Sequence, residues 1–189
     1  MKKLDFKALK LRPFDLQRFA ETLEAVQGKR IIYLYRMLSD ATTTDAKSIA
    51  FSTENENSLS RDADITQTKS GPIRTPGAVE TEISLTSIMA KGDDMIDKIK
   101  KAVIDGSVVE LWEVNLDEEG SSDNVGKFKA TYYQGFVTEL TLSTSAEDAT
   151  EISMTYGPNG TGATGYATVT DEQQELASYV FKDTAREGA

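Results

Sequence analysis

A glycine pattern between residues 160 and 165 is the first feature of this sequence that could bind a ligand. Gly160, Gly162 and Gly165 reproduce the spacing G-x-G-x-x-G literally, and the pattern follows an expected strand. In dinucleotide-binding proteins the last glycine opens a helix whose N-terminus holds a pyrophosphate. Here residues 166–169 continue as a β-type run, so the sequence offers no such helix and no βαβ unit. The pattern therefore predicts a glycine-rich turn rather than a nucleotide site.

Two short acidic motifs have residue types that bind divalent cations. Asp62 and Asp64 lie in a polar stretch, and Asp93 and Asp94 follow a glycine. Neither motif continues into an EF-hand loop with its central Gly and terminal Glu. A loop acid and a helix cap explain them better. A carboxylate pair for glycoside hydrolysis is equally uninformative, because 31 acidic residues guarantee that some pair has a suitable separation.

The sequence contains no histidine and no cysteine. Histidine is the most common general base and metal ligand, and without it the usual activation of a serine nucleophile is lost. The lack of cysteine removes thiol chemistry and disulfides, and it suits a reducing compartment. Neither a P-loop nor a G-x-S-x-G motif is present. We therefore predict no enzyme, no cofactor, and no catalytic, cofactor-binding or metal-binding residues.

Charge is distributed unevenly along the chain. The formal net charge is -10, yet residues 1–30 contain eight Lys or Arg against four acids, which leaves 13 basic and 27 acidic residues in the remainder. Such an acidic body repels nucleic acid, because affinity for phosphates requires clustered Lys and Arg. Solubility alone also accounts for this charge. No apolar run approaches the roughly 18 residues that a membrane span requires.

The elements that must position these residues are mostly strands. A principal helix is expected after Gly92, with Asp93 as its N-cap and Gly106 at its end, and a short C-terminal helix is expected from Thr170 to about Phe181. Strands are expected at 31–37, 47–54, 78–86, 107–115, 127–133, 136–143, 151–156 and 166–169. This pattern predicts a mainly β fold, a β-sandwich or open barrel of seven or eight strands with the central helix packed on a sheet. The core is expected to include the aromatic residues Trp112, Tyr132, Tyr133 and Phe136.

Between two of these strands lies a polar stretch, residues 55–77, that is too long for an ordinary hairpin turn. Both flanking strands alternate between an apolar face, with Ile49, Phe51, Ile83 and Leu85, and a small or acidic face. They can hold the base of the stretch in place. We interpret residues 55–77 as a loop that reaches another molecule.

The expected domain organisation has three parts. Residues 1–26 form a basic N-terminal extension, either an arm or a disordered leader, because Pro13 breaks any single helix there. Residues 27–183 form the β domain, and residues 184–189 form a flexible tail.

Four segments carry a resemblance to a known family: SRD with TKSGPIRTPG (60–62 and 68–77), IMAKGD (88–93), KATYYQG (129–135) and SAEDA (145–149). In this order they resemble the major tail protein, or tail tube protein, of long, non-contractile-tailed phages that infect Gram-positive bacteria. The likeness runs from about residue 27 to residue 183. It implies a β-sandwich subunit that forms hexameric rings, which stack into the tube through which the genome leaves.

The resemblance also implies roles for individual residues. The polar strand faces would line the channel, where repeated carboxylates repel DNA phosphates. These expected lining residues are Ser48, Ser52, Glu54, Glu80, Glu82, Ser84, Glu139, Thr141 and Ser143. The segment 55–77 would contact the adjacent ring. Its expected stacking residues are Arg61, Asp62, Asp64, Lys69 and Arg74.

The implied partners are further copies of the chain, the tape measure protein and other tail proteins, while DNA passes without specific binding and no membrane is contacted. The implied location is the virion tail, after assembly in the host cytoplasm. Two alternatives stay open. A tail terminator or a tube or ring protein of an injection apparatus would share the fold, and a terminator would stop at one ring. A monomeric β-sandwich binding module, for example for carbohydrate, would not assemble.

Overall fold

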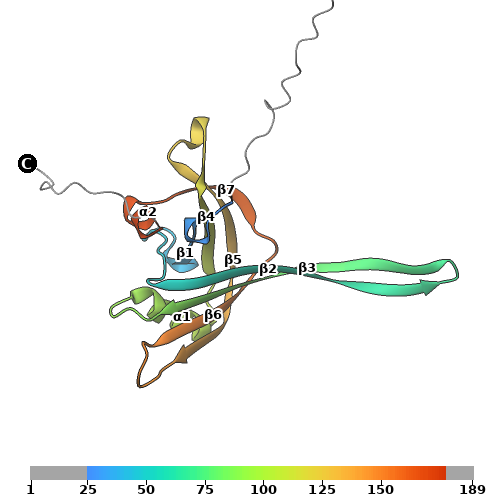
Figure 1. Ribbon diagram of the computed structural model, residues 1–189, viewed down its shortest axis with the longest axis horizontal. Coiled ribbons are helices and arrows are strands. Elements are labelled where there is room, and N and C mark those ends of the chain that lie inside the picture. The colour runs from blue at the N-terminus through green and yellow to red at the C-terminus, as the bar shows by residue number, and fades with distance from the viewer. Residues whose placement is uncertain (1–24, 178–189) are drawn as a thin grey trace, which may run out of the picture.

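The computed structural model describes residues 25–177 of the 189-residue chain. The described part contains seven strands, a principal helix and a short second helix, which confirms the predicted mainly β fold class (Figure 1). The N-terminal extension predicted at 1–26 lies outside the described residues except for its last two positions, and the tail predicted at 184–189 lies wholly outside them.

All seven strands are hydrogen-bonded into one antiparallel sheet. Its order is β1-β4-β5-β6-β3-β2, and β7 pairs with β5 as well. The strands are β1 Ile31–Met37, β2 Ser52–Thr68, β3 Gly71–Ile88, β4 Val109–Glu119, β5 Lys127–Ser143, β6 Glu151–Pro158 and β7 Ala163–Thr168. The helices are α1 Asp94–Asp105 and α2 Asp171–Ala177, with short 3₁₀ turns at Gly28–Arg30, Leu38–Asp40 and Ser122–Asn124.

Strand β5 belongs to both halves of the sheet. Its first half lies between β4 and β7, and its second half pairs with β6. The sequence predicted separate strands at 127–133 and 136–143 that meet at Gly135 in a bulge or bend, but the strand is continuous. Gly135 is required there because a Cβ would overlap the backbone of Gly157 on β6. One extra residue between Val137 and Glu139 forms a bulge, which reverses the alternation of faces along the strand.

The main core lies between the curved sheet and α1. Helix α1 begins at its N-cap Asp93, whose side chain accepts a hydrogen bond from the Met95 N–H, and it ends at Gly106 in the left-handed conformation, as predicted. Its buried face packs against residues of β1, β3, β4, β5 and β6. The buried residues include Tyr35, Ile83, Ile99, Leu111 and Tyr156.

A second, smaller apolar cluster covers the opposite face of β1, β4 and β5. Leu34, Val114 and Phe128 form it together with Val169, which follows β7. The sheet near β4 is therefore covered on both faces, and this rigid part supports the rest of the molecule.

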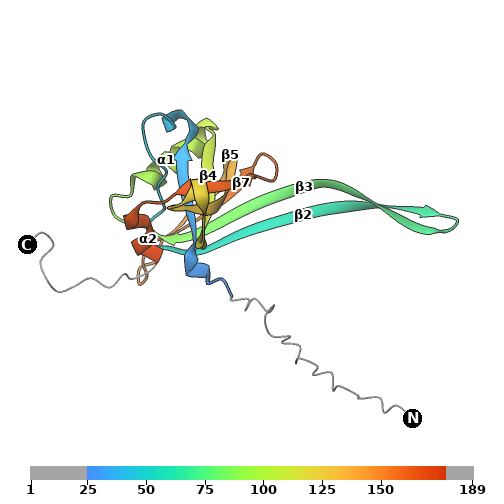
Figure 2. The ribbon, with the colours of Figure 1, turned by 90° about the horizontal axis from the view of Figure 1, so that it is seen from above.

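The segment predicted as a loop, 55–77, is instead most of a regular β-hairpin. β2 and β3 pair continuously out to Thr68 and Gly71, apart from one register shift at the base, between Ser52 and Glu54, and one midway along the ribbon, between Arg61 and Ala63. Residues 58–70 are all exposed, and the two-stranded ribbon projects from the body (Figures 1 and 2). We call residues 58–82 the arm. The loop prediction was wrong because strand periodicity in a sequence depends on one buried face, and both faces of this ribbon lie in solvent.

The strand predicted at 47–54 is also corrected. Lys47 forms an isolated bridge with Tyr35, and β2 begins only at Ser52. Ile49 is buried as expected, but Phe51 has a positive φ of 52° and is 68% exposed. The turn before β2 therefore breaks the apolar alternation that the sequence suggested.

Candidate functional site

Two rows of paired residues cross β2, β3, β6 and β5 on the side of the sheet that faces away from α1. One row is Glu54, Thr86, Ser153 and Thr141. The other row is Glu56, Ser84, Thr155 and Glu139. The alternate residues Leu85 and Met154 are buried in the main core, which fixes these rows on the opposite side. We call the two rows, with the neighbouring pair Ser143 and Glu151, the polar face.

The polar face is acidic and contains no Lys or Arg at any of these positions. A shallow hollow runs over it, lined by side chains of β3, β5 and β6 that include Ser84, Glu139 and Thr155. The side chains of the polar face are each small or acidic, so this surface repels anions and offers them no cationic binding group.

Seven of the nine residues predicted to line a channel lie on the polar face or on its continuation along the arm: Glu54, Glu80, Glu82, Ser84, Glu139, Thr141 and Ser143. Glu80 and Glu82 pair with Ser60 and Ser58, beyond the last β3–β6 pair at Ile83. They therefore lie at the base of the arm, where the sheet has only two strands.

The remaining two predicted residues lie elsewhere. Ser48 is half-buried in the irregular segment before β2. Ser52 pairs with the fully buried Ser87, and the register shift between Ser52 and Glu54 separates it from the polar face.

Sequence reasoning missed five members of the polar face: Glu56, Thr86, Glu151, Ser153 and Thr155. Glu56 was not predicted to line the channel because the loop was predicted to begin at residue 55. The alternation along β6 was visible in the sequence, but only the pairing of β6 with β3 and β5 brings that strand into the polar face.

The arm carries the five residues predicted for stacking: Arg61, Asp62, Asp64, Lys69 and Arg74. All five are exposed, and the ion pairs of the described residues involve none of them. The arm also exposes three large apolar side chains, Leu59 at 60%, Ile65 at 50% and Ile73 at 57%. A free two-stranded ribbon is marginally stable in water, so this surface gains stability when another molecule covers it.

A polar network anchors the base of the arm to the rigid part of the sheet. Asn57 donates to Glu113 Oε2 at 2.5 Å and to the Tyr133 hydroxyl at 3.1 Å. The Tyr33 hydroxyl donates to the same Glu113 oxygen at 3.1 Å. Burial, followed by the charge of Glu113, raises the pKa of Tyr33, so this hydroxyl stays protonated as a donor. The network joins β1, β2, β4 and β5 and fixes where the arm leaves the body.

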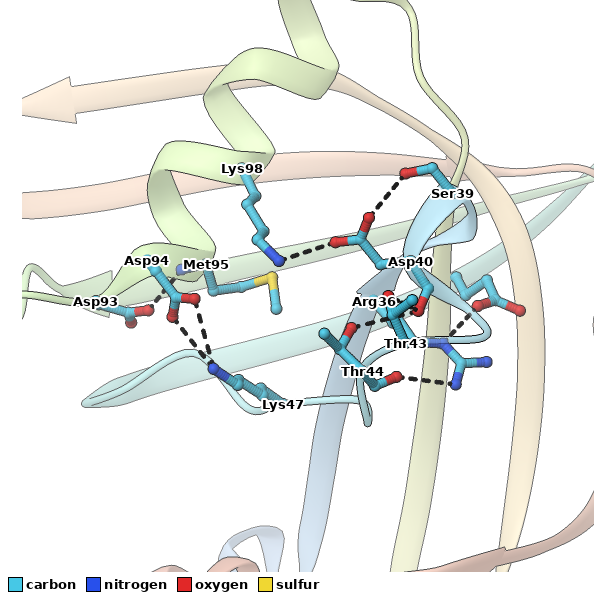
Figure 3. Close-up of polar contacts among 11 residues, drawn as sticks. Arg36, Ser39, Asp40, Thr43, Thr44, Lys47, Asp93, Asp94, Met95 and Lys98 are labelled. Atoms are coloured by element: carbon cyan, nitrogen blue, oxygen red, sulfur yellow. Dashed lines mark hydrogen bonds and ion pairs between the residues drawn. The ribbon is translucent and has the colours of Figure 1, made fainter.

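Two ion pairs join the segment between β1 and β2 to α1 (Figure 3). Helix α1 provides the cation in one pair and the anion in the other. Lys98 of α1 pairs with Asp40 at 2.8 Å, and Asp94 of α1 pairs with Lys47 at 3.4 Å. The hydrogen bond from Lys98 holds the pKa of Asp40 below its usual value. These contacts set the position of the chain immediately before β2.

The glycine-rich pattern forms a turn, as predicted. Gly160 and Gly162 have φ values of +82° and +79°, and β7 begins at Ala163 instead of a helix.

The two acidic motifs have structural roles or positions that do not involve a metal ion. Asp93 caps α1, and Asp62 and Asp64 lie on the arm. Within residues 25–177, no three acidic side chains gather into a group that could hold a metal ion.

The aromatic residues predicted in the core divide between core and surface. Tyr133 is buried, but Phe136 is 38% exposed because it points away from the core just before the β5 bulge. Trp112 and Tyr132 are half-buried on the other face of the sheet, with ring centroids 5.0 Å apart. Arg36 lies over the Trp112 ring and pairs with the buried Glu110 at 2.7 Å. These rings stabilise the sheet and form no exposed platform for sugars or bases.

None of the helices in residues 25–177 has the length and apolar character needed to cross a bilayer.

Comparison with known proteins identifies relatives of most of the described chain. A family model described as phage tail tube protein matches residues 25–164. A protein of Staphylococcus phage phiMR25 described as a tail protein is 35% identical over 161 residues, which cover 84% of this chain and 82% of the relative.

Solved structures share the fold. The tail tube of SPP1 superposes with a TM-score of 0.66 at 20% identity, and the match covers 87% of this chain and 95% of that protein. A tail protein of a gene transfer agent particle, from a structure refined with C6 symmetry, has a TM-score of 0.56 at 16% identity, and the match covers 76% of this chain and all of that protein.

Proposed function

Because the chain belongs to the phage tail tube protein family, we propose that copies of it join edge to edge into rings of six, and that these rings stack into the tail tube of a virion. The observation that carries this proposal is the polar face, which is acidic and is bounded by two strand edges that have no partner within residues 25–177. The ring size follows the family resemblance and agrees with the C6 symmetry of the gene transfer agent tail.

The two free edges support ring closure. β2 pairs only with β3, so its outer edge has no partner in the described chain. β5 also lacks a partner beyond Gly135 on the side where β4 lies, because β4 begins opposite Gly135. Three antiparallel pairings separate β2 from β5, so the two edge strands run in opposite directions. The β2 edge of one copy can therefore pair antiparallel with the β5 edge of the next, which removes both exposed edges.

In a ring closed this way, the polar face turns toward the hole. Glu54, Glu56, Glu139 and Glu151 then repeat around the wall with no cation between them. Carboxylates at this density repel the phosphates of passing DNA within the Debye length, about 10 Å at 0.1 M salt. The lining thus provides a conduit that DNA crosses without binding. Before ejection, the tape measure protein occupies the hole of the tube.

The arm supports stacking. Its two-stranded part has about eleven residues in each strand, a reach of roughly 35 Å at about 3.3 Å per residue. Alternating charges from Arg61 to Arg74 then pair with charges of the adjacent ring and set its register. Each exposed pair contributes little, but the contact repeats in every subunit.

Electron cryomicroscopy of the purified full-length protein tests the proposal. We expect tubes in which Glu54 and Glu139 face the hole and the arm touches the next ring. Isolated rings would instead indicate a tail terminator or another single-ring component. A single monomeric species at all concentrations, or a map in which the polar face turns outward, would contradict the proposal.

A further inference from the structure

Phe51 has a backbone conformation that its side chain does not favour. Its φ is 52°, and Ser122 is the other non-glycine residue with a positive φ in the described chain. A Cβ disfavours the left-handed region, and a bulky residue there is a genuine outlier. The Phe51 ring gains little from this strain within its own subunit, because 68% of the residue is exposed.

Three hydrogen bonds hold this conformation in place. The Ala50 N–H donates to Asp93 Oδ2 at 3.2 Å, and the Ala50 carbonyl accepts from the fully buried Ser87 hydroxyl at 2.6 Å. The Phe51 carbonyl accepts from the Ile88 N–H at 3.1 Å. Asp93 is itself fixed, because its other carboxylate oxygen accepts from the Met95 N–H at the start of α1 (Figure 3). The backbone on both sides of the Phe51 ring is thus held by α1 and β3.

Two further exposed apolar residues neighbour Phe51 in the pairing of the backbone. Ile88, which is bonded to Phe51, is 40% exposed, and the following Met89 is 46% exposed. We call Phe51, Ile88 and Met89 the apolar strip. Strain that the surroundings impose on an exposed aromatic residue is typical of a binding site, where a rigid ring loses little entropy on contact.

The position of the strip indicates its partner. Phe51 immediately precedes β2, whose outer edge is unpaired in the described chain. The opposite free edge of the same sheet, on β5, exposes its own apolar side chains, Phe136 at 38% and Leu142 at 55%. Each copy therefore has an exposed apolar strip beside one free edge and one exposed apolar residue on each face of the other free edge.

We propose that Phe51 is the apolar anchor of the contact between neighbouring copies of this chain, and that it packs against the β5 edge of the next copy. This inference rests on the proposed edge-to-edge assembly and names the residue on which that contact most depends. Anchors of this kind lower affinity by about 30-fold or more when they are removed.

Phe51→Gly separates this role from a structural one. Glycine favours a positive φ, so the variant keeps the backbone and relieves its strain while it removes the ring. We expect the melting temperature of the dilute monomer to be unchanged or higher. We expect the critical concentration for assembly, measured by light scattering and sedimentation, to rise about 30-fold. Phe51→Leu, which keeps an apolar side chain and the same strain, is the matched control and should assemble within a few-fold of wild type.

The possible outcomes distinguish this inference from the function on which it rests. If wild type assembles and Phe51→Gly assembles equally well, Phe51 is not an anchor, although the ring proposal survives. If Phe51→Gly lowers the melting temperature of the monomer, the ring belongs to the core of its own subunit and the inference is overturned. If wild type stays monomeric at every concentration, the assembly proposal and the anchor both fail.

Discussion

At the scale of single residues, Gly162 and Gly160 differ in what surrounds them although both have a positive φ. A Cβ on Gly162 would lie 2.5 Å from the Tyr133 ring and 2.8 Å from the Thr131 methyl, whereas a Cβ on Gly160 would meet nothing within 4 Å. Gly162→Ala should therefore add a clash to the backbone strain and lower the free energy of unfolding by about 2 kcal/mol. Thermal unfolding should show a melting temperature lower by about 4–8 °C.

Gly160→Ala is the matched control for this substitution, since it imposes the backbone strain alone. Its expected cost is about 1 kcal/mol, or roughly half the shift. Equal shifts for the two variants would contradict the packing argument. The same comparison explains why the G-x-G-x-x-G pattern is present without a nucleotide site, because these glycines serve a turn and its contact with β5.

Asp40 gives a prediction about pH. The hydrogen bond from Lys98, followed by that from Ser39, lowers the pKa of Asp40 from its ordinary value of 3.8. A carboxyl group whose pKa falls on folding stabilises the protein above its unfolded pKa, and this contribution is lost as the pH falls through the folded pKa. The difference in melting temperature between wild type and Asp40→Asn should therefore be largest near neutral pH and shrink below about pH 4.

Asp45 provides the control, because it is an exposed acid in the same segment with no ion pair in the described chain. Asp45→Asn should show a smaller difference from wild type at neutral pH. A difference for Asp40→Asn that does not change with pH would contradict this role.

At the scale of elements, the arm shows why sequence patterns can fail to predict a strand. Pattern reasoning finds strands by a continuous apolar run, as in β1, or by one buried apolar face, as in β3 near Ile83. The arm has no buried face, and its charges and turn formers are typical of a loop. The projection of the arm from the body was predictable from its length and polarity, but its hairpin conformation was not. A bulge or bend was expected at Gly135, but the bulge lies between Val137 and Glu139, because one inserted residue changes the faces without changing composition.

Removal of the arm should separate stacking from folding. Replacing residues 62–78 with Asn-Gly joins the paired residues Arg61 and Val79 by a two-residue turn. The removed part buries no core residue, so the melting temperature of the monomer should change by less than about 2 °C. Electron microscopy should show rings without long tubes. Tubes of wild-type length would exclude the arm as the stacking element, and loss of rings would show that the arm also acts within a ring.

At the scale of the whole molecule, the sequence predicted the class of fold and the acidic character better than the geometry of the site. The principal helix, the first strand and the alternation on β6 were all predictable, because each has a strong local pattern. The polar face was not, since it depends on which strands are neighbours and on register shifts near Ser52 and Val137. Long-range pairing of this kind leaves no local signal, which is why the predicted set left out Ser153 and Thr155 and included Ser52.

The charge of the polar face provides the last prediction. Glu54→Lys with Glu139→Lys changes the net charge of the two rows together from -3 to +1, so assembled tubes should retain a short fluorescent oligonucleotide that wild-type tubes release. Inside the tube the oligonucleotide should be protected from nuclease, and its retention should fall steeply between about 50 and 200 mM salt. Asp97→Lys with Asp105→Lys makes the same change of charge on the exposed side of α1, across the sheet from the polar face. Oligonucleotide bound by this control should be digested by nuclease. If the first variant forms tubes by electron microscopy and retains no protected oligonucleotide, the polar face does not line the hole.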